Sequence, residues 1–277
     1  MYTLGLYEKA MPNHLSIAEK LAETKAAGFD FMEISIDETD EKLARLKMSA
    51  AERREIAEHT RANGVGIKTM CLSGHRKFPL GSLESNIRER SLEIMRDAIT
   101  LANDIGVRII QLAGYDEYYN PSNEQTKAYF RENLRKCVEI AAANAVILAF
   151  ETMETPFMDT VGKAMEYVGE INSPYLKIYP DLGNLTNAAK LYSHDVIDDI
   201  ESGRGHIAAL HVKETVPGKY RDMMYGDGHV DFDAGIAKAR SLGVRIFTAE
   251  FWYLGNDDWR GDLRRAREFV DAKISLQ

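Results

Sequence analysis

The dominant pattern along the chain is a regular alternation of short apolar runs with longer segments in which apolar residues recur at helical spacing. An apolar run of four to eight residues bounded by turn residues is typical of a strand buried on both faces. Such runs occur at 3–7, 29–36, 65–72, 107–114, 145–152, 175–181, 206–213 and 244–252. The clearest lies within AVILAFETME, where an unbroken apolar run ends at the acid Glu151.

Helical segments separate these runs. The spacing of apolar residues predicts helices over 15–27, 50–62, 85–105, 123–143, 159–171, 188–200, 232–241 and 260–272. Most of them end beside a residue that can adopt the left-handed conformation closing a helix, namely Gly28, Gly64, Gly106, Asn144, Asn172, Gly203 or Gly243. Repeated strand–helix units without a linker or a break in composition predict a single (β/α)8 TIM barrel domain over residues 1–277.

Composition narrows the class of protein and its partners. The 277 residues are 45% hydrophobic and 28% charged, which is ordinary for a globular domain. A net charge of -8 and a pI of about 5.5 argue against DNA or RNA as the main partner, but a local basic pocket can still bind a small anion. The 2 cysteines, the absence of a signal-like N-terminus and the lack of a membrane-length apolar run predict a soluble cytoplasmic protein without membrane contact.

Titratable side chains stand at the ends of four consecutive predicted strands. In a parallel barrel these ends form the active face, and neighbouring strands lie about 4.8 Å apart. Glu151, Asp181, His211 and Glu250 are therefore expected to reach one point. A lone acid at a strand end is more often a helix cap or a surface group, so the interpretation depends on all four occurring together. Three carboxylates and one imidazole suit one Mn²⁺, Mg²⁺, Co²⁺ or Zn²⁺ ion with open positions for substrate.

Cationic and polar residues near the same strand ends are candidates for binding an anionic substrate group. They are Ser73, His75, Arg76, Lys77, Lys213, Lys219 and Arg221. Arg76 and Lys213 are favoured because they follow strand ends, whereas Lys219 and Arg221 are expected to be solvated surface charges. His229 lies in a Gly-rich loop, and spacing alone does not decide whether that loop reaches the site, so His229 is a secondary candidate. No Walker loop or GxGxxG motif precedes a helix, so no nucleotide cofactor is expected.

Several motifs resemble those of a known superfamily. FETM, YPDLGN, LHVKET and AEFW, with SGHRKFPLGS after the third strand, are similar to the xylose-isomerase-like barrels. Within that superfamily the chain most resembles the L-ribulose-5-phosphate 3-epimerases, also called L-xylulose-5-phosphate 3-epimerases, of the L-ascorbate utilisation route. The similarity covers nearly the whole chain, including LGLYEKAMP and the PGKY…YGDGHVDF loop.

The resemblance implies an isomerase that acts on carbohydrate phosphates. It would interconvert L-ribulose 5-phosphate and L-xylulose 5-phosphate by deprotonation and reprotonation at C3, through a metal-stabilised cis-enediolate. It implies that Glu151, Asp181, His211 and Glu250 hold one divalent metal, that Glu151 and Glu250 also transfer the protons, and that the protein is a homodimer. Asn184 stands where free-ketose 3-epimerases usually carry histidine, which favours a phosphorylated ketose. The expected substrate-binding residues are Ser73, His75, Arg76, Asn184 and Lys213.

Three other functions share parts of this pattern. An isomerase or epimerase of hexulose phosphates or other ketoses would use the same metal and similar bases. A DNA-repair endonuclease on this barrel would use several metals, more histidines and a basic face, which the net charge of -8 disfavours. A non-enzymatic sugar-binding protein would not need three converging carboxylates. The sequence leaves open the metal, the preferred ketose and which glutamate abstracts the proton.

Overall fold

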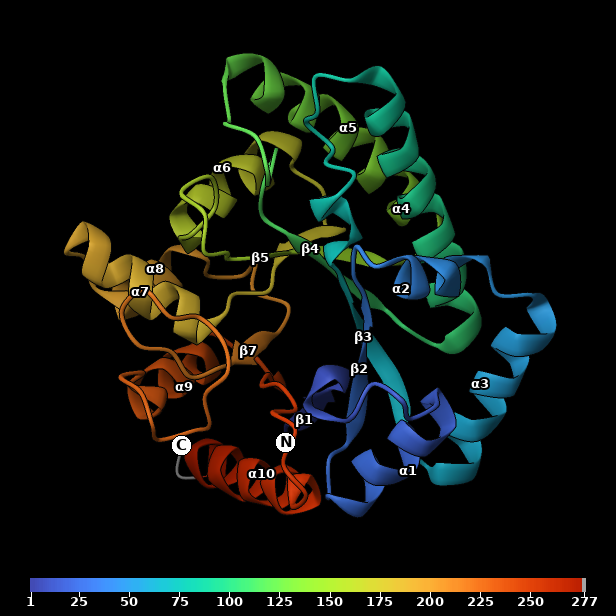
Figure 1. The fold of residues 1–277 in the computed structure, drawn as a ribbon. Coiled ribbons are helices and arrows are strands. Elements are labelled where there is room, and N and C mark those ends of the chain that lie inside the picture. The colour runs from blue at the N-terminus through green and yellow to red at the C-terminus, as the bar shows by residue number, and fades with distance from the viewer. Residues whose placement is uncertain (276–277) are drawn as a thin grey trace.

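The chain folds into a sheet of eight parallel strands that curls into a barrel. The computed structural model describes residues 1–275, and the strand order is β6-β5-β4-β3-β2-β1-β8-β7 (Figure 1). The strands are β1 (Thr3–Tyr7), β2 (Phe31–Ile36), β3 (Gly66–Leu72), β4 (Ile109–Ala113), β5 (Ile147–Glu151), β6 (Leu176–Ile178), β7 (Leu210–Val212) and β8 (Ile246–Ala249). Two isolated parallel bridges, Ile178 to Ile207 and Asp181 to His211, join β6 to the β7 side. The predicted barrel is confirmed.

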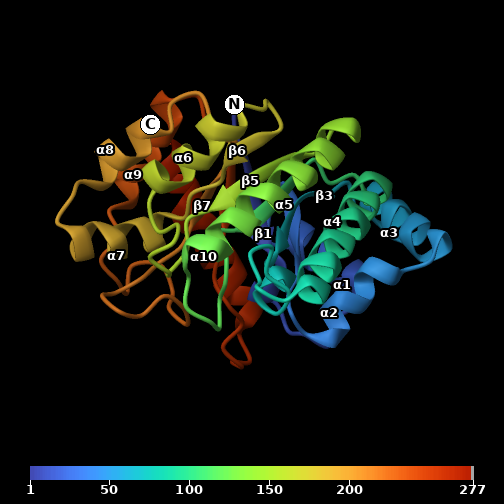
Figure 2. The same cartoon turned by 90° about the horizontal axis from the view of Figure 1, so that it is seen from above.

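Helices surround the sheet (Figures 1 and 2). They are α1 (Ile17–Ala26), α2 (Asp40–Ala44), α3 (Ala50–Asn63), α4 (Ser85–Ile105), α5 (Glu124–Ala143), α6 (Val161–Ile171), α7 (Leu182–Tyr192), α8 (Val196–Ser202), α9 (Phe232–Ser241) and α10 (Trp259–Ser275). Short 3-10 turns are η1 (Glu8–Ala10), η2 (Arg45–Lys47) and η3 (Ser73–Arg76). No helix within residues 1–275 combines the length and the apolar character needed to cross a bilayer.

Two helix predictions were wrong. The short helix α2 was missed because five residues carry too little periodicity to be seen in sequence. The segment expected as one helix over 188–200 is two helices, α7 and α8, separated at Ser193, whose φ is 55°. Helix α7 also begins earlier than predicted, at Leu182, because the Asp181 side chain accepts a hydrogen bond from the Asn184 backbone and caps its N-terminus.

The predicted helix ends are only partly confirmed. Positive φ angles occur at Gly28, Gly64, Gly106, Asn172 and Gly243. Asn144 instead has a φ of -110°, and the left-handed residue is Ala145, with a φ of 54°. Gly203 has a φ of -88°; a Cβ there would lie 2.8 Å from the Val161 side chain, so close packing rather than backbone conformation explains this glycine.

Apolar side chains of the strands and helices form one large core between the sheet and the helical layer. A buried charged cluster interrupts it next to β1. Glu8 is fully buried and contacts three cations, with Arg45 at 2.8 Å, Lys42 in direct contact and Lys20 at 3.8 Å. A buried carboxylate is tolerated only when it is paired in this way, so the cluster fixes the segment after β1 against α1 and α2.

Candidate functional site

Four side chains converge at the carboxyl ends of β5 to β8. Glu151 is the last residue of β5, Asp181 follows β6, His211 is in β7 and Glu250 follows β8. One ligand-type atom from each lies within 4.8 Å of the others, and all four residues are buried. The structure thus brings together the four residues that the sequence selected, and they are a group that could hold a metal ion.

The His211 imidazole faces the three carboxylates with one nitrogen. Its Nδ1 atom lies 2.6 Å from Oε2 of Glu250, 3.8 Å from Oε1 of Glu151 and 4.0 Å from Oδ2 of Asp181. The bridge between Asp181 and His211 places these two residues side by side where the barrel closes. Four donors around one point match the mixed oxygen and nitrogen set that divalent transition metals accept.

The hydrogen bonds around the carboxylates leave specific oxygens free. Asp181 Oδ1 accepts a hydrogen bond from the Asn184 N–H at 2.7 Å and lies 3.3 Å from Lys213 Nζ. Within residues 1–275, the buried Asp181 Oδ2 has no hydrogen-bond partner, and the buried Glu250 Oε2 has no hydrogen-bond donor of good geometry although it lies 2.6 Å from His211 Nδ1. Because a buried carboxylate oxygen without a donor is costly, a cation on these two oxygens fits the observed arrangement.

The four residues of the cluster differ in the direction in which their pKa values are shifted. Burial raises the pKa of Asp181 to about 8 and also raises the pKa of Glu151. Burial acts in the same direction on Glu250, but Lys213 and His211 outweigh it and hold the pKa of Glu250 well below its usual range. Burial disfavours the imidazolium of His211, yet Glu33 and Glu250 raise the pKa of this histidine above its usual value. Without a cation, the cluster therefore retains a proton near neutral pH.

A polar layer inside the barrel supports His211, and the sequence analysis did not assign it a role. Glu33 Oε1 lies 2.6 Å from His211 Nε2, and Glu33 Oε2 accepts hydrogen bonds from Thr69 at 2.6 Å and Tyr179 at 3.1 Å. Gln111 Nε2 lies 3.1 Å from His211 Nδ1. The available signal was a glutamate inside FMEISI, because every residue of that strand is buried.

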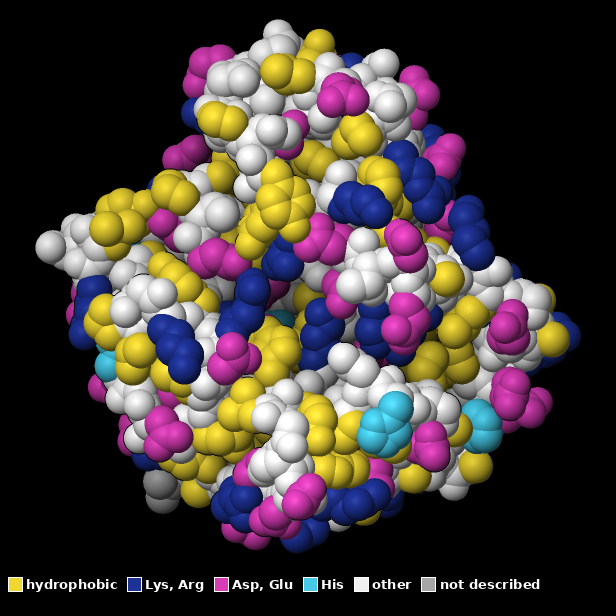
Figure 3. Space-filling view, in the orientation of Figure 1, with side chains coloured by type: hydrophobic (Ala, Val, Ile, Leu, Met, Phe, Trp, Pro, Cys, Tyr) yellow, Lys and Arg dark blue, Asp and Glu magenta, His cyan; other side chains and the backbone are white. Residues whose placement is uncertain are grey.

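A cleft above the cluster opens to solvent. It is lined by Tyr7, Lys9, Cys71, Ser73, Arg76, Glu151, Met153, Glu154, Lys213, Arg221, Glu250 and Trp252. Figure 3 shows Lys and Arg side chains, interspersed with Asp and Glu, around a hollow near the middle of one face. Ser73, Arg76 and Lys213 line the cleft as the sequence suggested. Lys213 is buried and contacts two of the carboxylates, at 3.3 Å from Asp181 and 4.0 Å from Glu250.

Two expected substrate-binding residues have other contacts. The buried His75 places Nε2 3.1 Å from the Ser91 carbonyl oxygen on α4, and burial lowers its pKa to about 4. Asn184 donates to the Thr152 carbonyl oxygen at 2.7 Å, and its backbone donates to Asp181. Neither side chain lines the cleft. His75 instead contacts α4, and Asn184 supports Asp181 of the carboxylate cluster.

Arg221 lines the cleft, contrary to the surface position expected for it. It contacts Glu154 at 2.9 Å, and its guanidinium lies 5.8 Å from the centre of the Trp252 ring. The β7–α9 loop that carries Arg221 is organised by the buried Glu214, which accepts the backbone N–H groups of Gly226 and Val230. Loop geometry of this kind has no signature in local sequence spacing.

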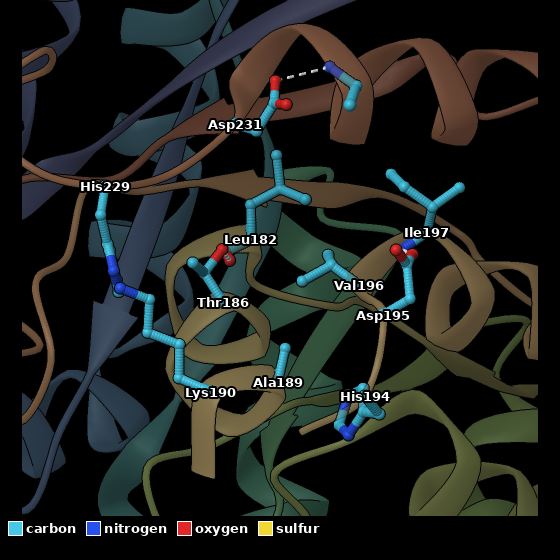
Figure 4. A pocket seen from close by; sticks show the side chains of 11 residues that line it. Leu182, Thr186, Ala189, Lys190, His194, Asp195, Val196, Ile197, His229 and Asp231 are labelled. Carbon is cyan, nitrogen blue, oxygen red and sulfur yellow. Dashed lines mark hydrogen bonds between the residues drawn. The ribbon is translucent and has the colours of Figure 1, made fainter. Parts of the chain in front are cut away.

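The other cationic candidates lie outside the cleft. Lys219 is exposed, and Lys77 contacts Asp40 at 3.4 Å on the surface. His229 lies in a separate cavity between α7, α8 and α9, where Figure 4 shows it pointing towards Lys190. Its Nε2 atom lies 3.2 Å from the Thr215 hydroxyl oxygen. Spacing alone left open whether His229 reaches the carboxylate cluster, and the structure places it away from the cleft.

Comparisons with known proteins agree with this architecture. Residues 21–273 match the family model of the xylose isomerase-like TIM barrel. The L-ribulose-5-phosphate 3-epimerase UlaE of Shigella boydii is 41% identical over 273 residues, which cover 98% of this chain and 95% of the relative. A D-psicose 3-epimerase crystallised with D-fructose superposes with a TM-score of 0.82 at 14% identity, covering 98% and 99% of the two chains. The IOLI protein with a bound zinc atom gives a TM-score of 0.76 at 16% identity, covering 99% and 98%.

Proposed function

This chain belongs to the xylose isomerase-like TIM barrel family and is a close relative of the L-ribulose-5-phosphate 3-epimerases, and we propose that it shares their activity. The proposed reaction interconverts L-ribulose 5-phosphate and L-xylulose 5-phosphate by removing a proton at C3 and returning it from the opposite face. The observation that carries the proposal is the convergence of Glu151, Asp181, His211 and Glu250 within 4.8 Å under an open cleft.

One divalent ion held by these four residues is the proposed cofactor. The buried Asp181 Oδ2, which has no hydrogen-bond partner in the described chain, and the crowding of Glu250 Oε2 against His211 Nδ1 at 2.6 Å support this assignment. When bound, such an ion supplies the positive charge that stabilises a cis-enediolate as it develops. Zn²⁺, Mn²⁺, Mg²⁺ and Co²⁺ all fit the donor set of three carboxylates and one imidazole.

Glu151 and Glu250 are the proposed acid and base. They come from β5 and β8, the outer two of the four strands, so a ketose lying across the cleft would have one carboxylate on each face of C3. Their environments push the pKa values apart, since that of Glu151 is raised and that of Glu250 is lowered. Such a difference suits a pair in which one member accepts a proton while the other donates one.

The phosphate group is proposed to bind at the end of the cleft formed by Ser73, Arg76, Arg221 and Lys9. The Nε atom of Arg76 is buried without a hydrogen-bond partner in the described chain, and its guanidinium lies 4.4 Å from the centre of the Tyr118 ring. Arginine side chains held in place by aromatic rings favour bidentate contacts with phosphate. Lys213 is assigned to the carboxylate cluster rather than to the phosphate because of its contacts with that cluster.

Further proposals concern assembly and location. We infer that residues 1–277 act as a single domain, in the cytoplasm and as a homodimer, in line with the small phosphorylated substrate. Light scattering on the purified protein tests the dimer, because a monomeric mass at working concentration would contradict it.

Proton NMR in heavy water with L-xylulose 5-phosphate tests the activity. The expected result is deuterium uptake at C3 with formation of the ribulose epimer, abolished by a chelator and restored by a divalent ion. Glu151→Gln and Glu250→Gln are expected to slow this uptake by about 10²- to 10⁴-fold, whereas the surface variant Glu201→Gln retains it. Metal content is measured in each variant, because both glutamates are also proposed ligands. Uptake at C1 instead of C3 would indicate an aldose–ketose isomerase and overturn the proposal.

A further inference from the structure

We infer that Glu33 is a positioning residue that orients His211 towards the metal and thereby sets the metal affinity of the site. The inference rests on the proposed function, since it assigns His211 to a divalent ion. Glu33 lies on β2, across the barrel from β7, and its side chain is fully buried. It is not one of the four converging residues, and it does not line the substrate cleft.

The contacts of Glu33 determine which imidazole nitrogen is free. Glu33 Oε1 lies 2.6 Å from His211 Nε2, while His211 Nδ1 faces Glu250, Glu151 and Asp181. An ionised carboxylate only accepts hydrogen bonds, so a neutral His211 must carry its proton on Nε2. Nδ1, which lies 2.6 Å from Glu250 Oε2 and 3.1 Å from Gln111 Nε2, then carries the lone pair that a metal ion in the carboxylate cluster would bind.

The second oxygen of Glu33 is held just as firmly. Thr69 donates to Oε2 at 2.6 Å, and the Tyr179 hydroxyl donates to the same atom at 3.1 Å. The Tyr179 hydroxyl also lies 2.6 Å from the Thr248 hydroxyl, which extends the network to β8. The Tyr179 ring meets the imidazole at 4.7 Å with an interplanar angle of 65°, so the ring plane of His211 is fixed as well.

Charge balance distinguishes this role from ordinary fold stabilisation. No Lys or Arg within residues 1–275 forms a salt bridge with Glu33, whose ionic contact is His211 alone. A buried carboxylate supported only by two hydroxyls and one imidazole is a poor way to stabilise a fold. A divalent ion on the far side of the imidazole would stabilise Glu33, and by reciprocity Glu33 would strengthen the binding of the ion.

Metal titration of the chelator-treated full-length protein tests the inference. With Mn²⁺ as the probe, Glu33→Gln is expected to raise the Kd by about 10- to 100-fold relative to the wild type. The matched control is Asp199→Asn, which removes charge from a partly buried carboxylate that accepts the N–H groups of Val161 and Gly162 at the start of α6. This control is expected to leave the Kd within twofold.

Two further readouts separate positioning from stabilisation. The thermal midpoint of metal-free Glu33→Gln is expected to equal or exceed that of the wild type, because glutamine keeps the size and hydrogen-bonding capacity of the side chain while it removes a buried charge. In nitrogen-15 NMR of the Zn²⁺ form, wild-type His211 is expected to be protonated at Nε2, and the chemical shift of this proton is expected to show a strong hydrogen bond. Glu33→Gln is expected to lose this shifted signal. Should Glu33→Gln not fold, Thr69→Val and Tyr179→Phe each remove one donor to Glu33 and are expected to raise the Kd severalfold.

The outcomes separate this inference from the proposed function. Tight binding by the wild type with an unchanged Kd in Glu33→Gln, or in both donor variants if Glu33→Gln does not fold, would overturn the role of Glu33 and leave the metal site intact. A wild-type protein that binds no divalent ion would overturn both. A raised Kd together with a metal-free midpoint equal to or above that of the wild type would establish positioning through His211, whereas a raised Kd with a lowered midpoint would overturn it in favour of fold stabilisation.

Discussion

Lowering the pH from 8 to 6 is expected to weaken metal binding by displacing the equilibrium towards a protonated cluster. Without a cation, burial holds the pKa of Asp181 at about 8, so a proton competes with the ion for the carboxylates. An ordinary aspartate has a pKa near 3.9 and would show no such competition in this range. The perturbation therefore tests whether the buried cluster is the place where the ion binds.

A lower limit for the effect follows from the titration of Asp181 alone, because the raised pKa of His211 means that this residue must also lose a proton before it can bind the ion. With a pKa of about 8, roughly half of the clusters are deprotonated at pH 8 but only about one in 100 at pH 6. The apparent Kd should rise about 50-fold, equivalent to about 2.4 kcal/mol. The sign for stability is opposite in the metal-free protein: a carboxyl whose pKa is raised by folding contributes stability that is present below about pH 4 and is lost as the pH rises towards 8.

Isothermal titration calorimetry with Mn²⁺ at pH 6, 7 and 8 measures this dependence. Repeating the titration in two buffers of different ionisation enthalpy counts the protons released, and at least one is expected at pH 7, from Asp181 with a further contribution from His211. At pH 8 and 100 times the Kd, the ion should add about 2.7 kcal/mol of stability, or about 5–10 °C in thermal midpoint. Asp181→Asn is the control, since it should bind weakly and with a smaller pH dependence than the wild type. A wild-type Kd that stays within twofold from pH 6 to pH 8 would refute the reasoning.

Three other changes test separate parts of the structure. Arg221→Ala is expected to raise the KM for the ketose phosphate about 10- to 100-fold while Lys219→Ala leaves it unchanged; equal effects on a free ketose would argue against a phosphate contact. Glu8→Gln leaves two buried lysines and the partly buried Arg45 without a countercharge and should cost about 3–5 kcal/mol in urea unfolding, and a loss below about 1 kcal/mol would contradict the paired-charge interpretation. Gly228→Ala places a Cβ 2.2 Å from a Glu214 carboxylate oxygen, so it should disturb the β7–α9 loop. Its main effect should be a raised KM for the ketose phosphate rather than a lowered thermal midpoint of unfolding.

The sequence predicted the barrel and its converging residues because both depend on periodic or local signals. Apolar runs predict where the strands lie, and parallel strands bring their carboxyl ends to one face. Spacing alone therefore predicted that Glu151 and Glu250 lie close together. Lys213 was recognised as belonging near a strand end; its contact with a phosphate stays a prediction, and its contacts within the site could not be derived from spacing. A phosphate was expected, and the structure shows contacts with two carboxylates of the cluster.

The features that sequence reasoning missed depend on contacts between distant segments. Glu33 and His211 are 178 residues apart and meet only because β2 and β7 face each other across the barrel. Arg221 reaches the cleft because Glu214 folds its loop inwards through backbone hydrogen bonds. His75 has the chemistry of a site residue, but its side chain packs against α4 and binds the Ser91 carbonyl oxygen.

The closure of the barrel also links the proposed metal ion to the local stability of the joint between β6 and β7. β6 has three residues, and the following Pro180 offers no N–H, so few backbone hydrogen bonds hold the two free edges of the sheet together. Asp181 stands on one edge and His211 on the other. An ion bound to both residues would cross-link the two edges. Amide protons of the segments that join β6 to β7 should therefore exchange with solvent faster when the ion is removed.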